Sequence, residues 1–497
     1  MTPPAILGDG RARAFSLLVI CALIQAAALA AAAFATRAIF SALHAGEPLA
    51  LSLLAWLGMA GVLAALAQFA LAGIGEKMGQ AFAASIRTTL FEHASRSPQS
   101  DLDKRRMGYH LLRFSGDLSA LTTWPSRGLP RLIEAAVLLP AALAVLWMLH
   151  IPFACIAGAT ALVTVLILAL SYPALKAVYA RLRYDRARLA ADMAERMPVA
   201  AQLAAMGRRR KEHARLSSCA DAVIDTALRA RRFEAALVLL PEAMVALVAC
   251  GLLWIGARNG LPAAHLAAAL AALALTLRPL RNGTKALRQH ASFLAAHNKL
   301  CAALARETVS DKGAAMKLPD GPLSLSVTDD AGQERVFAAA TCTRVDTIDL
   351  DKLAPVLMGA QPAARNCIKI NGVDLHLLSR ANLGRRVGLL SDTPLILKGS
   401  LRRNLTLGLR KRPTDREIIE RIEAAGHSET LARLGPLSRR LPERGASLTK
   451  DDRMRLSLLR MIVQAPGLLL VLTPMHDTLD CFSKGSTVLH RLPLDHI

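Results

Sequence analysis

The chain has 497 residues, which is enough for two to four domains, and 53% of them are hydrophobic. This share is too apolar for an ordinary soluble protein and favours an integral membrane protein. The formal net charge is +23, yet aromatic residues make up only 4% of the chain. Because base stacking needs aromatic side chains, the excess of Lys and Arg indicates the cytosolic loops of a membrane protein rather than nucleic-acid binding.

Several apolar stretches have close to the roughly 20 residues that are needed to cross a bilayer core. They predict six transmembrane helices at 15–34, 51–74, 132–149, 151–171, 235–257 and 261–277. Lys and Arg gather in the loops after the second and fourth helices, whereas the alternate loops hold only Arg258. Since positive loops stay in the cytosol, both termini are expected there. The two long loops are expected to turn near 98–110 and 195–207.

The last third of the chain contains a series of short segments that follow one another in a characteristic order. They are Ile368–Leu375, Val387–Leu401, Asn404–Gly408, Glu443–Arg453, Pro466–Pro474 and Thr478–Asp480. In order and spacing they resemble the nucleotide-binding domain of an ABC exporter, with its hydrophobic turn, Q-loop, signature, Walker B strand and D-loop. The resemblance implies an α-helical membrane domain of the exporter type with six transmembrane helices at 1–304. It further implies a linker at 305–321 and an α/β P-loop-NTPase-like domain with degenerate motifs at 322–497.

The residues that hold nucleotide in that family are largely missing. A phosphate site needs a Gly-rich loop and a Lys. That loop should lie at Arg344–Lys352, which contains no Gly, and Leu350 takes the place of the Lys. The Walker B carboxylates that hold Mg²⁺ and polarise water are replaced by Thr473 and Pro474. No catalytic residue and no metal site are therefore expected in this chain.

The remaining nucleotide-site positions are altered as well. Asp392 stands at the Q-loop position. The signature reads Leu448–Asp452, so that its glycines are lost and four positions become Thr449, Lys450, Asp451 and Asp452. Asp480 keeps the D-loop position, and His490 matches the switch His, which we interpret as a vestige. Scaffold residues are thus kept while the chemistry is lost.

The resemblance implies one half of an exporter, so a second half is expected as partner, either a different chain or a second copy. Lipid and an unidentified exported solute, peptide, lipid or thiol complete the expected partners, in a bacterial cytoplasmic (inner) membrane. The family hydrolyses ATP, but this chain alone is expected not to, and ATP and Mg²⁺ are expected only through a partner subunit. The alternative is a non-hydrolytic membrane scaffold or regulator of another protein.

One acid in the membrane helices is a candidate residue of the transport pathway. Glu242 follows Pro241 in the fifth apolar stretch, and an intramembrane acid is a functional hypothesis by default. The alternative is a residue beside a helix kink that faces a vestibule open to the cytosol. The walls of the predicted pathway are otherwise Ala, Leu and Val, which argues weakly against a strongly anionic cargo.

Overall fold

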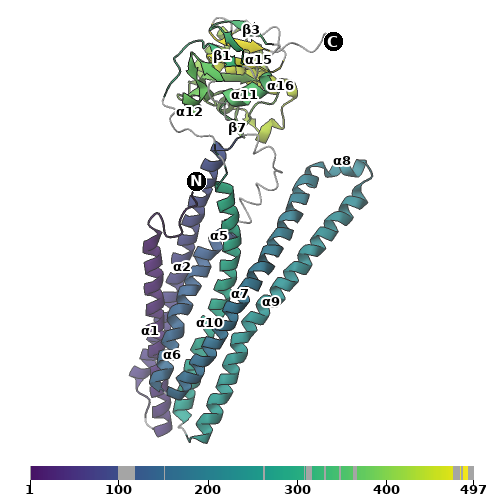
Figure 1. Ribbon diagram of the computed structural model, residues 1–497. Helices are drawn as coiled ribbons and strands as arrows, with labels where there is room; N and C mark the ends of the chain where they lie inside the picture. The colour runs from purple at the N-terminus through teal and green to yellow at the C-terminus, as the bar shows by residue number, and fades with distance from the viewer. Residues whose placement is uncertain are drawn as a thin grey trace. The chain divides into compact units, whose positions relative to one another are not determined.

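The computed structural model describes residues 2–46, 48–98, 118–149, 151–260, 263–306, 308, 316–328, 332–345, 349–361, 367–473, 482 and 485–490. The chain forms two compact units. The first comprises Met1–Ser95 and Arg105–Arg306, and the second comprises Arg96–Lys104 and Glu307–Ile497. The first consists of long helices and the second of helices and strands (Figure 1). The linker expected at 305–321 lies partly outside the described residues, so the domain limits stay a prediction.

The described part of the first unit is mainly helical. They are α1 (Arg11–Ala45), α2 (Leu51–Arg96), α5 (Leu118–Thr123), η2 (Trp124–Gly128), α6 (Leu129–Leu149), α7 (Ile151–Arg196), η3 (Met197–Val199), α8 (Ala200–Ala205), α9 (Arg209–Arg258) and α10 (Ala263–Leu304). Among the described residues, five helical segments are long and apolar enough to cross a membrane, and they overlap the first five predicted spans. The sixth predicted span falls on α10, partly outside the described residues, and stays a prediction.

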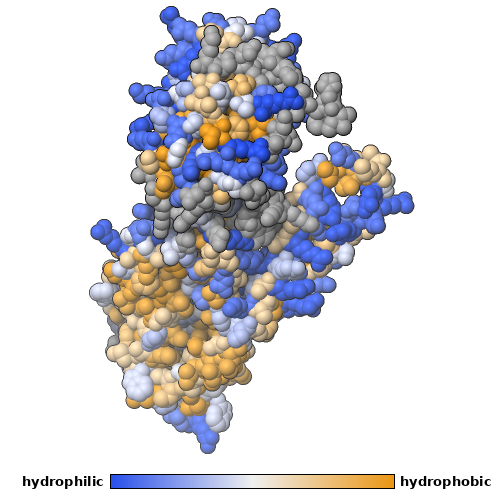
Figure 2. Space-filling view, turned by 45° about the horizontal axis from the view of Figure 1, so that its top comes forward, coloured by the Kyte–Doolittle hydropathy of each residue, from blue (hydrophilic) through white to orange (hydrophobic). Residues whose placement is uncertain are grey.

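Apolar side chains cover one end of this helical unit (Figure 2). Leu51 is 84% exposed, Phe69 81% and Leu170 72%. Such exposure is unfavourable in water but suits hydrocarbon, where a helix satisfies its own backbone hydrogen bonds. The surface thus has the character of a membrane domain.

A π-helical turn interrupts the third long helical segment and packs closely against α2. This turn is η2, and a Cβ atom added to Gly75 would lie 2.5 Å from the backbone oxygen of Ser126. One added to Gly79 would lie 2.5 Å from the Cβ atom of Ser126. Glycine is therefore needed at both positions, because small residues let membrane helices approach closely. Single π-helical turns within helices frequently mark functional sites.

The helices α7 and α9 pack along each other and are joined through η3 and α8. Figure 1 shows this hairpin diverging from the other helices toward α8. Near its tip, Arg196 pairs with Asp192 at 3.2 Å and with Glu212 at 2.7 Å. The turn expected at 195–207 is present, whereas the one expected at 98–110 lies almost wholly outside the described residues.

The second unit contains three sheets. An antiparallel sheet has the order β2-β1-β4-β5, a parallel sheet has the order β3-β10-β9-β6, and β7 pairs with β8. The strands are β1 (Leu325–Thr328), β2 (Glu334–Phe337), β3 (Cys342–Arg344), β4 (Ile368–Ile370), β5 (Val373–Asp374), β6 (Val387–Leu390), β7 (Gly399–Ser400), β8 (Arg440–Leu441), β9 (Leu468–Val471) and β10 (Thr487–His490).

Helices accompany these sheets and complete the core. They are α11 (Leu350–Leu357), η4 (Leu375–Leu377), α12 (Arg380–Arg386), α13 (Leu401–Leu405), α14 (Asp415–Ala424), α15 (Ser428–Leu434), η5 (Glu443–Gly445) and α16 (Lys450–Gln464). All four residues of β9 are buried. A parallel strand covered on both faces reads as a continuous apolar run, and this run is the one that resembles a Walker B strand.

Candidate functional site

The helix at the expected phosphate loop is capped by the carboxylate of the residue that precedes it. Asp349 precedes α11, and its Oδ1 atom accepts a hydrogen bond of 3.1 Å from the backbone N–H of Asp351. The ammonium of Lys352 lies 3.5 Å from the same carboxylate. Leu350, in the place of the phosphate Lys, is a core residue that is 1% exposed. A carboxylate thus occupies the helix N-terminus, where a phosphate would otherwise be favoured.

The altered signature closes the N-terminus of α16 in the same way. The backbone N–H of Asp452 donates to the hydroxyl of Thr449 at 3.1 Å, and the N–H of Thr449 donates back to Asp452 at 3.4 Å. This reciprocal arrangement is a capping box. Asp451 pairs with Arg455 at 2.7 Å. The first-turn donors of α16 are therefore partly used within the helix.

Two segments of the nucleotide-site pattern are also linked to each other. Lys450 of the signature position lies 3.0 Å from a carboxylate oxygen of Asp392 at the Q-loop position. The sequence predicted both residues as departures from the family pattern, but it did not predict that they pair. The structure therefore brings these two positions together through an ion pair.

Other predicted positions lie at the ends of the parallel strands. Thr473 follows β9 and is partly buried, while Pro474 and Asp480 lie outside the described residues. His490 ends β10 and pairs in register with Arg344 on one side and Val471 on the other. His490 thus lies at the end of a parallel strand, and its match to the switch His stays a prediction.

A buried arginine, which sequence reasoning missed, joins three segments of this unit. Arg460 of α16 is 8% exposed and donates to the backbone oxygens of Asn404 at 2.8 Å and Leu395 at 2.7 Å. Burial lowers its pKa from the usual 12.5 to about 10. In the sequence it is one of several basic residues of an amphipathic helix, so nothing distinguished it from a solvated side chain.

The predicted membrane acid Glu242 is paired rather than isolated. It contacts the guanidinium of Arg281 on α10, and the two side chains are 36% and 41% exposed. A second acid, missed at the sequence level, is more deeply buried. Glu134 of α6 is 7% exposed, lies 3.0 Å from Arg278, and accepts hydrogen bonds from Asn282 at 2.8 Å and Gln25 at 3.4 Å. The polar groups of the helical unit thus converge on α10.

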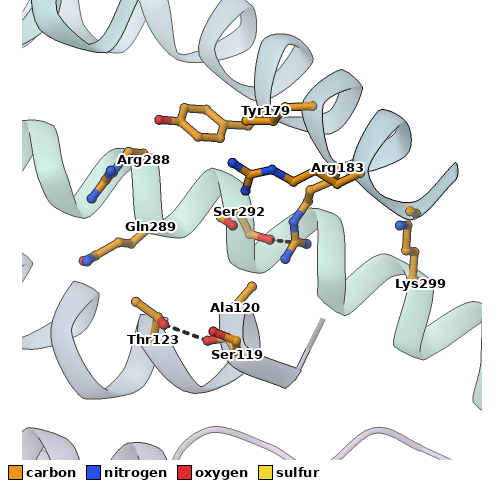
Figure 3. A pocket seen from close by; sticks show the side chains of 12 residues that line it. Ser119, Ala120, Thr123, Tyr179, Arg183, Arg288, Gln289, Ser292 and Lys299 are labelled. Carbon is orange, nitrogen blue, oxygen red and sulfur yellow. Dashed lines mark hydrogen bonds between the residues drawn. The ribbon is translucent and has the colours of Figure 1, made fainter. Parts of the chain in front are cut away.

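A basic cavity of about 530 Å³ lies within the helical unit (Figure 3). Its lining comes from three elements: Ser119, Ala120 and Thr123 of α5; Tyr179, Leu182, Arg183, Arg186 and Ala187 of α7; and Arg288, Gln289, Ser292 and Lys299 of α10. Four of these described residues are cationic and none is acidic. The cavity therefore has the charge to hold an anion.

Hydrogen bonds orient the cations around the cavity. Arg183 donates to the backbone oxygen of Ser292 at 2.9 Å, which joins α7 to α10 (Figure 3). Arg288 pairs at 3.0 Å with Glu234 of α9, which also accepts from Tyr179 at 3.0 Å.

A buried amide adds a second indication of a ligand. Gln289 lines the cavity and is 7% exposed, yet its Oε1 atom has no hydrogen-bond partner among the described residues. Buried polar atoms usually have a partner, so an unpaired one calls for an explanation. A polar ligand in the cavity would supply it. The expectation of apolar pathway walls concerned the membrane spans and stays a prediction, since this cavity is lined by residues outside them.

Comparison with known proteins places this arrangement in a family. Residues 15–259 match the ABC transporter transmembrane region. Multidrug resistance protein 4 of Entamoeba histolytica is 30% identical over 142 residues, which cover 25% of this chain and 11% of that protein. The transport/processing ATP-binding protein ComA of Streptococcus pneumoniae is 26% identical over 146 residues, 29% of this chain and 20% of ComA. The matched segments are thus a small part of these relatives' length.

A solved structure matches nearly the whole chain. It is described as a bacterial Atm1-family ABC exporter with ATP bound, and its TM-score is 0.81 at 18% sequence identity, covering 98% of this chain and 91% of that one. At this identity the likeness concerns the fold. On these matches, residues 15–259 are similar to the ABC transporter transmembrane region, and the chain has the fold of an ABC exporter half.

Proposed function

We propose that this chain is one half of a membrane exporter whose cavity between α5, α7 and α10 receives a small organic anion. The cavity itself carries the proposal, because four cations and an unpaired buried amide surround a space of about 530 Å³. Drug-sized ligands occupy pockets of about 300–1,000 Å³, so the volume suits a small solute or short peptide. A second half, from another chain or another copy, would complete the pathway.

Binding and flux tests separate this proposal from its alternative. The purified chain in detergent is expected to bind citrate, a small tricarboxylate, more tightly than the neutral trimethyl citrate. Vesicles that hold the chain and its partner are expected to move such an anion. If neither vesicle flux nor anion binding depends on the chain, the alternative of a non-transporting scaffold is favoured. The self-capped helices α11 and α16 favour that alternative, since they leave this chain without an evident nucleotide site of its own to power transport.

The topology proposal places both termini in the cytosol of an inner-membrane protein. It rests on the Lys and Arg of the loops, since positive loops are retained inside. Reporter fusions after residues 45 and 259 are expected to report the outside, and fusions after 100 and 200 the inside. A cytosolic signal at 259 would remove the hairpin of the fifth and sixth spans and with it the proposed six-span arrangement.

We further propose that the nucleotide site of this chain is inert. The purified chain is expected to show no measurable ATPase and no binding of Mg·ATP at Arg344–Lys352. Each lost preorganised donor typically costs about 10²–10³-fold in rate, and several are missing together. Self-capping by Asp349 and Asp452 adds negative charge where phosphate would approach.

A partner supplies the control for this prediction. Any hydrolysis in a complex is expected to vanish when the Walker Lys of the partner is replaced. Activity that survives removal of the partner, and that falls when His490 is replaced, would contradict the proposed inert site. A colorimetric phosphate-release assay on both preparations makes the comparison.

A further inference from the structure

A compact aromatic cluster joins three elements next to the basic cavity. The ring centroids of Trp124 in η2 and His290 in α10 lie 4.7 Å apart. Tyr172 of α7 places its hydroxyl 2.7 Å from the Nδ1 atom of His290 and stacks on the same ring. Phe293, one turn further along α10, completes the cluster at 6.2 Å from Trp124. Among the described rings, the centroid of His290 thus lies within 6.5 Å of the centroids of all three others.

Two of these elements, α7 and α10, also line the cavity, and the third, η2, directly follows α5, which supplies the rest of the lining. The cluster residues thus adjoin the cavity lining in sequence. Trp124 follows Thr123, and His290 follows Gln289, the buried amide without a partner for its Oε1 atom. Tyr172 lies two helical turns before Tyr179 on α7. Any change in the separation of α7, η2 and α10 at the cluster therefore changes the separation of the cationic and amide groups in the cavity.

Gly128 fixes the position of the tryptophan within this arrangement. A Cβ atom added to Gly128 would lie 2.3 Å from Trp124 and 3.2 Å from the Cβ atom of Gln289. The absence of a side chain there lets the Trp124 ring lie directly against its own π-helical turn. Cluster and cavity are consequently packed as one body, since contacts this tight leave no room for independent shifts.

Building on the proposed anion pocket, we propose that His290 is a positioning residue. Its neutral ring holds α7, η2 and α10 in the arrangement that binds the anion, and protonation of the ring releases the anion. In the neutral tautomer that carries its proton on Nε2, Nδ1 accepts a hydrogen bond from the hydroxyl of Tyr172. An imidazolium carries a proton on both nitrogens, so this hydrogen bond must be rebuilt with the reverse polarity. The charged ring also has to be held among three aromatic side chains.

The groups around His290 do not favour its protonation. On α7 these are Tyr172, which shares the hydrogen bond, and Lys176, whose charge lowers the pKa of the ring. From η2 the facing group is Trp124, which does not titrate, and α2 reaches the cluster through Phe82 against Phe293. On α10 itself, Arg288 lies two residues before His290 and is paired with Glu234 of α9 at 3.0 Å, so these two charges offset each other. His297, two turns after His290, stacks on Phe293.

The direction of the pH effect follows from the pKa of His290. Burial, and then the charge of Lys176, lowers this pKa from its usual 6.5. Below about pH 6.5, His290 is protonated more readily when its ring is solvated than when it is packed in the cluster. The packed arrangement therefore loses stability relative to the solvated one as the pH falls. The loss is at most about tenfold in population per pH unit. A cation that only attracted the ligand would have the opposite sign.

Two measurements on the full-length chain in detergent test this inference. In a variant with Trp56, Trp147 and Trp254 replaced by Phe, Trp124 fluorescence is expected to change on acidification with a midpoint below 6.5. The same change should be absent in His290→Gln. Tyr172→Phe, a milder variant, is expected to move the midpoint upward, because the neutral ring loses its hydrogen-bond donor. His297→Gln is the matched control on α10 and should leave the midpoint unchanged.

The second measurement couples the cluster to the cavity. Citrate itself takes up a proton between pH 7.5 and 5.5, so each affinity is compared with that of His290→Gln at the same pH. Across this range the affinities of the wild-type chain and of His297→Gln are expected to fall two- to tenfold further than that of His290→Gln. Affinity that rises on acidification, or that falls equally in all three proteins, would overturn the positioning role. A chain whose Trp124 titrates as described but that binds no citrate at any pH contradicts the anion pocket instead.

Discussion

Replacing Arg183 and Arg288 together by glutamine is expected to weaken citrate binding by at least about 100-fold. Hydrogen bonds to a charged partner contribute about 1.5–3 kcal/mol each, and about 1.4 kcal/mol corresponds to a tenfold change in affinity. The two residues lie on α7 and α10 on either side of the cavity (Figure 3). Each single variant should therefore lose about tenfold or more. Isothermal titration calorimetry in detergent at low ionic strength measures both.

The fold is expected to survive these changes. Without Arg288, Glu234 keeps the guanidinium of Arg231 at 3.0 Å and the hydroxyl of Tyr179 at 3.0 Å. Arg188→Gln is the matched control, because it removes the same charge from an exposed position of α7 that does not line the cavity. Equal losses in Arg188→Gln and Arg183→Gln would show that only the general positive field matters and would contradict a built anion site.

The cavity illustrates what the sequence could not provide. Arg183 and Arg288 are 105 positions apart in the numbering, and each lies in a charged run that the distribution of cytosolic loops already explains. Only the packing of α7 against α10 brings them to one space. Their arrangement around Gln289 depends on helix rotation and on the π-helical turn, neither of which has a clear periodic signal.

The membrane helices and the nucleotide-binding pattern were more accessible to sequence reasoning. Long apolar runs specify spans by themselves, because a bilayer imposes a fixed length. The positions of Leu350, Asp392 and Thr449 followed from spacing within an ordered pattern. Their contacts did not: the capping by Asp349 and the ion pair of Lys450 with Asp392 depend on local backbone geometry and side-chain rotamers. Glu242 was identified as an acid, but its partner Arg281 lies on another helix.

Glu134 is expected to be the more important of the two membrane-helix acids for stability. Glu134→Leu leaves Arg278 without its carboxylate and removes an acceptor from Asn282 and Gln25. Gln25 is fully buried, and its Oε1 atom already has no partner among the described residues. Arg278 is 40% exposed, so solvent screens part of its lost ion pair, while each buried polar group left without a partner costs about 1–3 kcal/mol. A large loss of thermal stability in detergent is therefore expected.

The isosteric variant and the second acid make this prediction selective. Glu134→Gln keeps the shape and the acceptor for Asn282 but removes the charge, so a loss of about 1–2 kcal/mol is expected. Glu242 is 36% exposed and its partner Arg281 is 41% exposed. An exposed ion pair contributes at most about 1 kcal/mol to stability. Glu242→Gln should therefore leave abundance and melting temperature nearly unchanged while altering anion flux in vesicles, where Arg281 loses its counter-charge.

Fluorescence-detected size-exclusion chromatography after stepwise heating ranks the three variants. A ranking in which Glu242→Gln is the least stable, or wild-type flux in that variant, would reverse the assignment of a structural role to Glu134 and a transport role to Glu242.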